Sequence, residues 1–363
     1  MELKGLNILI TSNEPWGDVW FSKHNYANEL SKQNRVVFID PTPRWQLQNV
    51  LGPEVSLVQV QEGLSVLRYR NVLPSVNDGA FRLNNTLISR AITKALGAQG
   101  LLPDLFLSFD PSRLYDPVLL GARHSAFIAV DVYTMHMRGE RFIYPRVDRF
   151  ITLSETFNAM YRPYNKPILT IGHAIPDTAF TAQAAPIGFS DYGLYVGTLD
   201  MRIDLELLSG LIEDHPDVPF VFIGPYTLDN DPQAQQLFRE GRFPNVHLVG
   251  AMPYRQLAAW IAGARFCLAP MGRHFPGNNI SHHKIFQYLA LGKPVFSTVF
   301  SEYLPFGHLL YMNDDRQAAR DELSEFLRAG EPAGLAAERI ALARTKSFDA
   351  TFQSIGDFLD RKH

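Results

Sequence analysis

Cysteine is nearly absent from the sequence, because the chain of 363 residues contains only Cys267. A single cysteine cannot form an internal disulfide, which excludes a disulfide-stabilised scaffold and fits a reducing compartment. Cys267 lies in the apolar run Phe266-Cys267-Leu268-Ala269, so we expect a buried core residue rather than a nucleophile. We also find no pattern of an export signal, and no apolar run approaches the ~18 residues that a membrane span needs. The sequence therefore predicts a cytoplasmic protein and leaves contact with a membrane surface open.

The chain also lacks an excess of charge of either sign. Lys and Arg number 34 against 37 Asp and Glu, which gives a formal net charge of −3. Nucleic-acid binders usually carry a strong basic excess, so we expect no nucleic-acid partner. Six arginines lie close together in the sequence and form either a solvated surface or a patch for anionic lipid or acceptor phosphate. They are Arg113, Arg123, Arg138, Arg141, Arg146 and Arg149.

Three common catalytic patterns are missing as well. No G-x-G-x-x-G follows the first predicted strand, and the sequence contains no G-x-x-x-x-G-K-[ST] phosphate loop. It also contains no G-x-S-x-G nucleophile elbow. These absences argue against a dehydrogenase-type dinucleotide site, a phosphate-loop NTPase and a hydrolase of the nucleophile-elbow type.

What the sequence does contain is a regular alternation of short apolar runs with helical patterns, and 46% of its residues are hydrophobic. This alternation predicts parallel sheets built from βαβ units, and the length predicts two Rossmann-like α/β domains. In the first half, strands are predicted at Leu6–Thr11, Arg35–Asp40, Ser65–Tyr69, Leu105–Phe109, Ala126–Val130, Phe150–Leu153 and Ile168–Ile171, and helices at Ser22–Lys32 and Phe81–Leu96. In the second half, strands are predicted at Gly193–Val196, Phe220–Ile223, Val246–Val249, Arg265–Ala269 and Val295–Thr298, and helices at Leu205–Glu213, Gln233–Arg239, Arg255–Ala262 and Ser281–Leu291.

The two domains are predicted to be joined by a linker over residues 179–190, where periodicity is lost and Ala, Pro, Thr and Gly accumulate. We expect an N-terminal domain over 1–178, a C-terminal domain over 191–345, and a final helix over 346–363 that packs back on the N-terminal domain. Ligands of such sheets bind at the carboxyl ends of the strands, and a cleft between the domains is the expected site.

The most informative segment is NNISHHKIFQYLALGKPV, residues 278–295. Ser281 is a suitable N-cap for a helix that Gly292 and Pro294 then end. The free backbone N–H groups of the first turn, together with Lys284, can cradle a diphosphate. The alternative is an ordinary βα helix whose polar start serves only capping.

This segment resembles the donor-site helix of GT-B-fold glycosyltransferases of the family-4-like type, which carries a pattern like K-x-F-E-Y-L-A-x-G-K-P-V. The matching residues here are Lys284, Phe286, Gln287, Tyr288, Leu289, Ala290, Gly292, Lys293, Pro294 and Val295. Four further stretches resemble the family in the right order. They are residues 149–180, 195–208, 220–225 and 245–270. The resemblance implies the GT-B fold, with two Rossmann-like parallel-sheet domains, and a nucleotide-sugar donor in the C-terminal one.

The resemblance also implies roles for individual donor-site residues. Arg202, five residues after Gly197, stands where the family places a basic residue on the donor diphosphate, whereas Thr198 replaces an Arg. Gln287 and Asn279 occupy the positions of two carboxylates, and their replacement leaves a retaining mechanism open to question. The remaining donor-site candidates are Met252 and Pro253 at the nucleobase, and Ser281, His282, His283 and Lys284 at the diphosphate.

Metal sites are the weaker interpretation wherever the sequence offers one. His274, His282 and His283 lie together without a cysteine or a suitably spaced carboxylate, so phosphate or sugar hydrogen bonding or simple exposure is preferred over zinc. Asp229-Asn230-Asp231 formally reads Asp-x-Asp but is typical of a turn and a helix cap. We expect no metal and no cofactor, with a UDP- or GDP-linked sugar as the co-substrate.

The N-terminal domain is predicted to hold the acceptor and the catalytic base. His24, in the first turn of a helix, and Asp131, directly after a strand, are the two candidates, and each could instead cap or hydrogen-bond locally. Asp110 before Pro111 is a weaker third candidate. The residues predicted to contact the acceptor are Trp16, Gly17 and Tyr133, with Trp20 and His136 nearby.

Taken together, the sequence predicts a metal-independent hexosyl- or glycosyltransferase that moves a sugar from a nucleotide donor to an acceptor hydroxyl. The acceptor is a glycan, a glycolipid or a small molecule, and the expected process is polysaccharide or glycoconjugate biosynthesis. Two alternatives stay open. One is a nucleotide-sugar epimerase on the same fold, and the other is a catalytically silent nucleotide-sugar-binding partner, which the loss of both carboxylates motivates.

Overall fold

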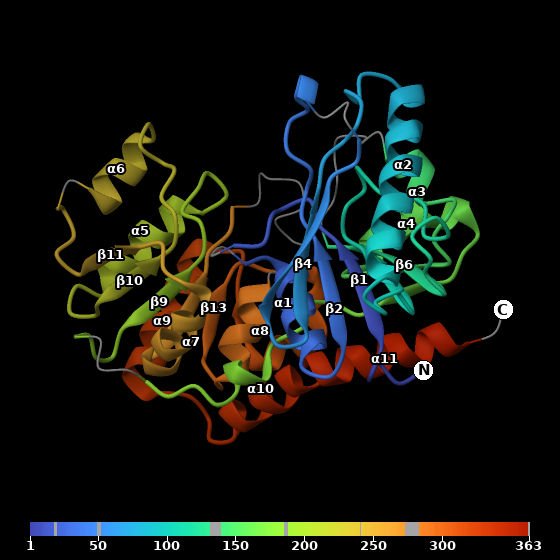
Figure 1. Cartoon of the computed structure of the whole chain (residues 1–363). Coiled ribbons are helices and arrows are strands. Elements are labelled where there is room, and N and C mark those ends of the chain that lie inside the picture. Colours follow the sequence, from blue (N-terminus) through green and yellow to red (C-terminus); the bar gives the residue numbers. More distant parts are fainter. Residues whose placement is uncertain are drawn as a thin grey trace. The chain divides into compact units, whose positions relative to one another are not determined.

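The structure is a computed structural model that describes residues 1–17, 20–48, 52–130, 139–184, 188–239, 241–272 and 283–361 (Figure 1). The chain divides into two compact units. Unit 1 consists of Met1–Gly172 together with Phe348–His363, and unit 2 consists of His173–Ser347. The chain therefore leaves unit 1 once and returns to it with its last helix. Within the described residues, no helix is long and apolar enough to cross a membrane.

Unit 1 contains a sheet of eight strands in the order β3-β4-β2-β1-β5-β6-β7-β8. Seven of these strands run parallel, and β3 pairs antiparallel with β4 at one edge. The strands are β1 Asn7–Thr11, β2 Arg35–Ile39, β3 Val55–Gln61, β4 Leu64–Tyr69, β5 Leu105–Ser108, β6 His124–Ala129, β7 Arg149–Thr152 and β8 Ile168–Thr170. The predicted parallel sheet is confirmed, and the antiparallel edge strand β3 was not predicted.

The helices of unit 1 are α1 Ser22–Ser31, α2 Asp78–Gly97, α3 Glu140–Ile143, α4 Asn158–Tyr161 and α11 Phe348–Asp360, with short 3-10 turns at Glu155–Phe157 and Arg162–Tyr164. Helix α2 begins three residues earlier than predicted, because the Asn77 side chain accepts a hydrogen bond from the Ala80 N–H and caps it. Helix α11 packs into this unit through the edge-to-face contact of Phe348 with Tyr26 and through a hydrogen bond from the Met1 amino group to the Gly356 carbonyl.

Unit 2 contains a fully parallel sheet of six strands in the order β11-β10-β9-β12-β13-β14. Its strands are β9 Gly193–Val196, β10 Phe220–Ile223, β11 Val246–Gly250, β12 Phe266–Ala269, β13 Val295–Ser297 and β14 Tyr311–Met312. Its helices are α5 Leu205–Asp214, α6 Pro232–Phe238, α7 Tyr254–Gly263, α8 His283–Ala290, α9 Arg316–Ala329 and α10 Leu335–Arg344, with 3-10 turns at Asp177–Ala179 and Ser301–Leu309. The predicted α/β class with two parallel-sheet domains is thus confirmed.

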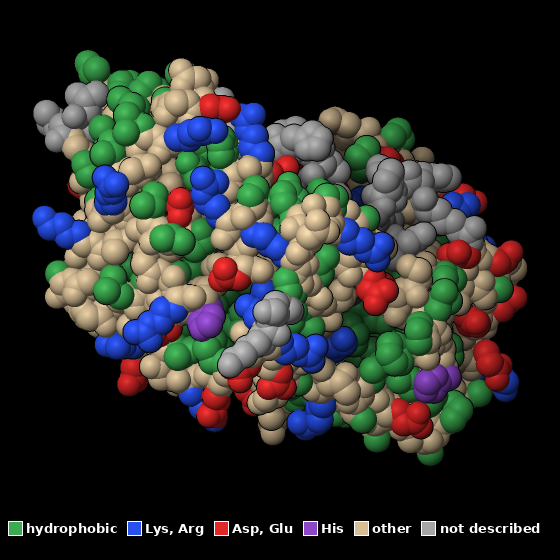
Figure 2. Space-filling view, turned by 90° about the vertical axis from the view of Figure 1, so that its right-hand side faces the viewer, with side chains coloured by type: hydrophobic (Ala, Val, Ile, Leu, Met, Phe, Trp, Pro, Cys, Tyr) green, Lys and Arg blue, Asp and Glu red, His purple; other side chains and the backbone are tan. Residues whose placement is uncertain are grey.

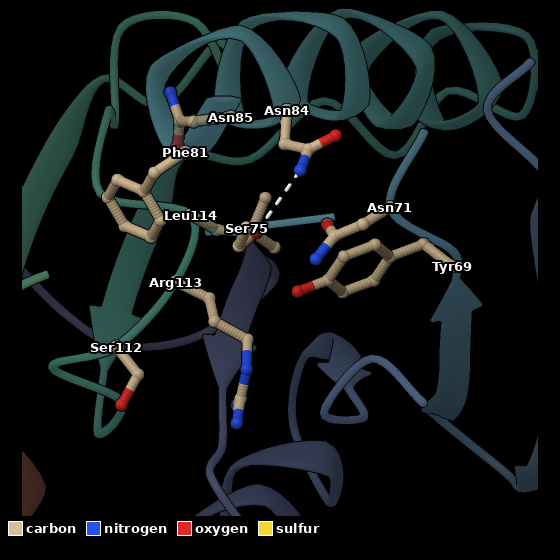
Figure 3. Close-up of a pocket in the computed structure, with 9 residues that line it drawn as sticks. All are labelled: Tyr69, Asn71, Ser75, Phe81, Asn84, Asn85, Ser112, Arg113 and Leu114. Carbon is tan, nitrogen blue, oxygen red and sulfur yellow. Dashed lines mark hydrogen bonds between the residues drawn. The ribbon is translucent and has the colours of Figure 1, made fainter. Parts of the chain in front are cut away.

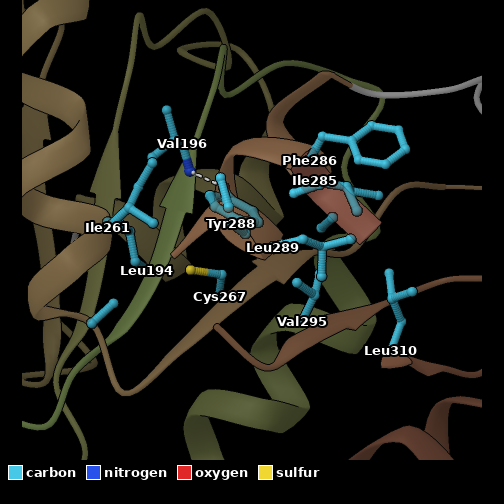
Figure 4. Close-up of a cluster of buried hydrophobic side chains, with 14 of the residues drawn as sticks. Leu194, Val196, Ile261, Cys267, Ile285, Phe286, Tyr288, Leu289, Val295 and Leu310 are labelled. Carbon is cyan, nitrogen blue, oxygen red and sulfur yellow. Dashed lines mark hydrogen bonds between the residues drawn. The ribbon is translucent and has the colours of Figure 1, made fainter. Parts of the chain in front are cut away.

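The two faces of the unit 2 sheet pack separate hydrophobic clusters. The cluster that includes helix α8 contains Cys267, Leu194, Ile285 and Leu289, which are fully buried (Figure 4). Burial raises the pKa of the Cys267 thiol, which keeps it protonated at neutral pH. The prediction that Cys267 is a core residue is therefore confirmed.

Candidate functional site

The candidate donor site begins at the carboxyl end of β9, where the chain turns at Gly197. The φ angle of Gly197 is +142°, in a region that L-residues rarely adopt. A Cβ atom at this position would also lie 3.0 Å from the Nζ of Lys284. Glycine therefore allows both the turn and the close approach of the lysine, and it brings the backbone of β9 to the first turn of α8.

Lys284 is a buried cation at this turn, with 8% of its surface exposed. Its Nζ atom lies 4.1 Å from the centre of the Tyr195 ring, which is a cation–π contact. In the part of the chain that the structure describes, no carboxylate forms an ion pair with Lys284. Burial, helped by the neighbouring charge of Arg202 and opposed by that of Asp200, lowers the pKa of Lys284 to about 7. A group with this pKa gains its charge readily when an anion binds.

Arg202 and Asp200 form a forked ion pair beside Lys284. The Arg202 Nε lies 3.0 and 3.1 Å from the two carboxylate oxygens of Asp200, and Nη2 lies 2.7 Å from Oδ2. Burial acts to raise the pKa of Asp200, but the hydrogen bonds and charge of Arg202 outweigh it and hold that pKa below its usual range. Asp200 therefore stays charged and fixes the guanidinium. About half of the Arg202 side chain remains exposed.

Tyr288 ties α8 to the end of β9. It lies four residues after Lys284, on the same side of the helix. The Val196 N–H donates a 2.9 Å hydrogen bond to the Tyr288 hydroxyl, deep in the core (Figure 4). The hydroxyl therefore holds the turn at Gly197 in register with the turn of α8 that carries Lys284. The side chain of Gln287, in the same helix, is also buried.

The other predicted donor-site residues have less distinctive surroundings. The Thr198 carbonyl accepts a 3.0 Å hydrogen bond from the Tyr195 hydroxyl. Met252 is half-buried against the core, and Pro253 is exposed directly before α7. Outside the described residues lie His274, Asn279, Ser281 and His282, together with the side chain of His283. Their predicted roles stay predictions.

The Asp-x-Asp sequence has a structural role in the helix that follows it. The Asp231 side chain accepts a hydrogen bond from the Ala234 N–H and caps α6. The Asp229 carbonyl accepts a 2.7 Å hydrogen bond from the Gln235 side chain. These contacts correspond to the turn-and-cap interpretation. Among the described residues there is no group of three or more His, Cys, Asp and Glu side chains that could hold a metal ion.

In unit 1, His24 is fully buried and hydrogen-bonded through both ring nitrogens. Nδ1 accepts from the Phe21 N–H at 3.0 Å, so Nε2 carries the proton and donates to the Pro15 carbonyl at 3.0 Å. Burial lowers the pKa of His24, which favours this neutral ring. These contacts correspond to the local alternative for His24, which fixes the loop after β1 on helix α1.

Of the two predicted acceptor residues of that loop, Trp16 packs against the His24 ring and Gly17 is exposed. The ring centre of Trp16 lies 5.2 Å from that of Phe38 and 5.6 Å from that of His24. The backbone N–H of Trp16 donates a hydrogen bond to the Asp40 carboxylate. The exposed Gly17 accepts a hydrogen bond from the Trp20 indole through its carbonyl. The other candidates of unit 1, Asp131, Tyr133 and His136, lie outside the described residues.

Asp110, the third candidate base, is buried and doubly held. It accepts a 2.7 Å hydrogen bond from the Ser112 N–H and pairs with the Arg113 guanidinium at 2.6 Å. The predicted Asp-Pro turn therefore supplies the partner of one carboxylate oxygen of Asp110, and Arg113 is the partner of the other. Arg113 was expected either on a solvated surface or in a patch for anionic lipid or acceptor phosphate, and the structure places it in the lining of a pocket whose residues the sequence did not reveal (Figure 3).

Three of the remaining arginines in this group are neutralised by acids, whereas Arg149 is buried and donates a 2.6 Å hydrogen bond to the Arg361 carbonyl. Arg123 pairs with Asp104, Arg141 with Asp78 and Arg146 with Asp116, all with substantial exposure. On the face drawn in Figure 2, Lys and Arg side chains are interspersed with acidic and uncharged ones. These paired side chains correspond to the solvated-surface interpretation. Arg138 lies outside the described residues.

Tyr195, Asp200 and Tyr288 are the site residues that the sequence analysis did not assign. Tyr195 lies under the Lys284 ammonium, and Tyr288 reaches a backbone N–H 92 residues earlier in the chain. Neither contact has a local signal, because each depends on how α8 packs on β9. The position of Asp200 two residues before Arg202 was a usable signal, since short-range Asp–Arg pairs fix a guanidinium.

Comparison with known proteins gives structural matches only. No protein-family model matches the chain, and no curated protein sequence matches it. Many solved structures match it, and those described here cover 97–98% of its length. Anabaena HepE in complex with UDP and glucose has a TM-score of 0.66 at 12% identity and covers 98% of this chain and 100% of its own. The sucrose-phosphate synthase of Thermosynechococcus elongatus has a TM-score of 0.65 at 14% identity, with 97% of each chain covered.

A UDP-forming α,α-trehalose-phosphate synthase from Burkholderia xenovorans has a TM-score of 0.63 at 12% identity, with 98% of each chain covered. At such low identity the likeness concerns the fold. The fold of this chain is the GT-B arrangement of two Rossmann-like domains that the sequence resemblance implied, and that part of the resemblance is confirmed.

Proposed function

We propose that the chain is a glycosyltransferase that moves a sugar from a nucleotide-sugar donor to an acceptor hydroxyl, in polysaccharide or glycoconjugate biosynthesis. Three facts support it. The fold matches sugar-phosphate synthases over nearly the whole chain, a matching structure holds UDP and glucose, and the sequence resembles the GT-B donor helix. The observation that carries the proposal is Lys284, a buried cation at the carboxyl edge of a Rossmann-like sheet without a carboxylate partner among the described residues.

The donor is proposed to bind in unit 2 with its diphosphate at the Gly197 turn. A buried ammonium without a counter-charge is costly, and a diphosphate supplies the missing negative charge. The backbone at Gly197, the first turn of α8, Lys284 and Arg202 would together hold the phosphate oxygens. During transfer the diphosphate departs with increased negative charge, and these preplaced groups stabilise it. We propose that these protein cations take the role that a metal ion has in other transferases.

The acceptor and the base are proposed to lie in unit 1. Both nitrogens of the His24 ring are occupied, so we assign His24 a positioning role for the Trp16 loop rather than proton transfer. Asp131 follows the last residue of β6 by two positions in the sequence, and since catalytic groups of α/β folds commonly follow the carboxyl ends of strands, we propose it as the base. Substitution Asp131→Asn should abolish transfer and leave donor binding unchanged.

The proposal is tested by thermal unfolding of the full chain with UDP, GDP, dTDP and CMP. A ligand at ~100 times its dissociation constant stabilises a protein by ~2.7 kcal/mol, which is readily measured as a rise in melting temperature. A rise with UDP or GDP supports the donor site, and no rise with any nucleotide contradicts it. Turnover then separates the alternatives: an epimerase converts the nucleotide sugar without acceptor, and a silent partner binds nucleotide without turnover.

A further inference from the structure

Unit 1 contains a pocket of about 350 Å³ whose lining does not include Trp16 or Gly17, two of the residues predicted to contact the acceptor. It opens at the carboxyl edge of the sheet, between the end of β4, the beginning of α2 and the loop after β5. Figure 3 shows nine lining residues, which are Tyr69, Asn71, Ser75, Phe81, Asn84, Asn85, Ser112, Arg113 and Leu114. Except for Phe81 and Leu114, each carries a hydroxyl, amide or guanidinium group, and none carries a carboxylate.

The Tyr69 hydroxyl is the feature that points to a ligand. Tyr69 is the last residue of β4, and 4% of its surface is exposed. Within the described residues no hydrogen bond to this hydroxyl is found, and the hydroxyl faces the pocket, where a ligand oxygen can reach it. In Figure 3 the ring extends into the pocket and its hydroxyl points towards the centre, between Ser75 and Arg113. Burial raises the pKa of Tyr69, so the hydroxyl remains a donor at neutral pH.

The electrostatic character of the pocket follows from Arg113. Its guanidinium donates to the Asp110 carboxylate, whose second oxygen is held by the Ser112 N–H. Since Asp110 is 2% exposed and Arg113 is the only charged residue among the described residues of the lining, the pair presents N–H donors with little net charge. An added carboxylate or phosphate would lose its hydration without gaining an unpaired cation. The pocket therefore favours an uncharged polar ligand.

The opposite wall offers a flat apolar surface. Phe81 stacks on Tyr115 with ring centres 5.4 Å apart, and Leu114 lies next to it in the lining. Donors and acceptors on one side with an aromatic ring on the other suit a pyranose, which has hydroxyls at its edge and C–H groups on its faces.

We propose that this pocket is an acceptor subsite that binds a neutral, hydroxylated sugar ring, with the Tyr69 hydroxyl donating to one of its oxygens. The inference rests on the proposed glycosyl transfer and deepens it, because it names the class of acceptor. Tyr69 is a binding residue and is not assigned a part in proton transfer.

The test is a saturation-transfer NMR titration of the full chain, with and without UDP. The probes are the methyl glycosides of glucose, galactose and mannose, together with methyl glucuronide as the anionic probe. We expect saturable binding of a neutral glycoside, weaker binding of the glucuronide, and a ~5–10-fold loss of affinity in Tyr69→Phe, as removal of one hydrogen bond predicts. The control is Tyr26→Phe, which removes a hydroxyl that is buried without a hydrogen-bond partner among the described residues and lies outside the pocket. It should bind like the parent chain.

The failure of this inference differs from the failure of the proposed function. If UDP raises the melting temperature but no neutral glycoside binds, the subsite is wrong and the donor site stands. Equal affinity in Tyr69→Phe and the parent chain, or tighter binding of the glucuronide, also overturns the subsite. Binding at Tyr69 without any nucleotide effect supports the subsite and contradicts the donor assignment instead.

Discussion

The cations at the carboxyl edges of the two sheets are held in opposite ways. In unit 1 each buried or half-buried cation described at this edge has its own carboxylate, since Lys23 pairs with Glu14 and Arg113 with Asp110. In unit 2, Lys284 rests on the Tyr195 ring, and Asp200, an acid whose charge acts on Lys284, is paired with Arg202 instead. Unit 1 therefore presents neutralised donors, whereas unit 2 presents positive charge without compensation. The difference indicates a neutral ligand for the first and an anionic one for the second.

The largest effect is expected where the uncompensated charge is removed. Lys284→Met should weaken UDP binding by ~1.5–3 kcal/mol, the usual value of a charge-assisted hydrogen bond. The melting temperature should not fall, because the substitution removes a buried charge that folding must desolvate. Calorimetric titration and thermal unfolding measure the two quantities. Lys94→Met, which removes an exposed lysine of unit 1, is the control and should change neither. Unchanged UDP affinity in Lys284→Met would remove the basis of the donor site.

The converse change creates an uncompensated cation in unit 1. Asp110→Asn leaves the Arg113 guanidinium without its carboxylate, and we expect a loss of about 1–3 kcal/mol in the free energy of unfolding. The pocket should then prefer methyl glucuronide over the neutral glycosides. Denaturant unfolding and NMR titration measure these effects. Asp78→Asn, which breaks an exposed pair with Arg141, should cost less than about 1 kcal/mol and leave the sugar preference unchanged.

The pH dependence of donor binding should distinguish the two edges next. Lys284 has a pKa of about 7 in the free protein, so it loses its proton as the pH rises, whereas a bound diphosphate favours the protonated form. UDP binding should therefore take up a proton, and its affinity should fall about 5-fold between about pH 7 and pH 8. An arginine stays charged in this range, so Lys284→Arg should lessen the dependence. An affinity that is flat in the parent chain would mean that Lys284 stays charged throughout.

The smallest expected effect concerns the hydrogen bond that aligns the donor turn. Tyr288→Phe leaves the buried Val196 N–H without its acceptor and should cost about 1–2 kcal/mol of unfolding free energy. UDP affinity should fall a few-fold in a variant that remains folded at the assay temperature. Calorimetric titration of UDP at a temperature well below the melting temperature of the variant measures this change in affinity. A stability loss with unchanged affinity would show that the hydroxyl serves the core alone.

How far the sequence predicts this molecule also differs between the units. The strands β9 and β10 have the bounds predicted from the sequence, because both are buried on two faces and read as continuous apolar runs. The predicted strands were short apolar runs. Strand β3 was missed because it is a largely exposed edge strand whose valines and leucine are interrupted by polar residues. Strand β14 was missed because two residues are too short to give a pattern.

The candidate site shows the same limit. Lys284 is predictable because its place in the first turn of a helix is a local property of the sequence. The Tyr195 ring beneath it and the Tyr69 pocket arise from contacts between distant segments, which no local pattern encodes. For His24 the predicted place in the first turn of the helix is correct, but no local pattern could show that the Pro15 carbonyl and the Phe21 N–H occupy both ring nitrogens.

The central claim is that unit 2 binds a nucleoside diphosphate through a lysine that gains its charge on binding. The direct measurement is calorimetric titration of UDP at about pH 7.5 in two buffers with different enthalpies of ionisation. We predict binding in both buffers, with heats that differ because the buffer supplies the proton that Lys284 takes up. In Lys284→Arg the heats in the two buffers should be equal. Absence of binding, or heats that do not depend on the buffer in the parent chain, would contradict the account.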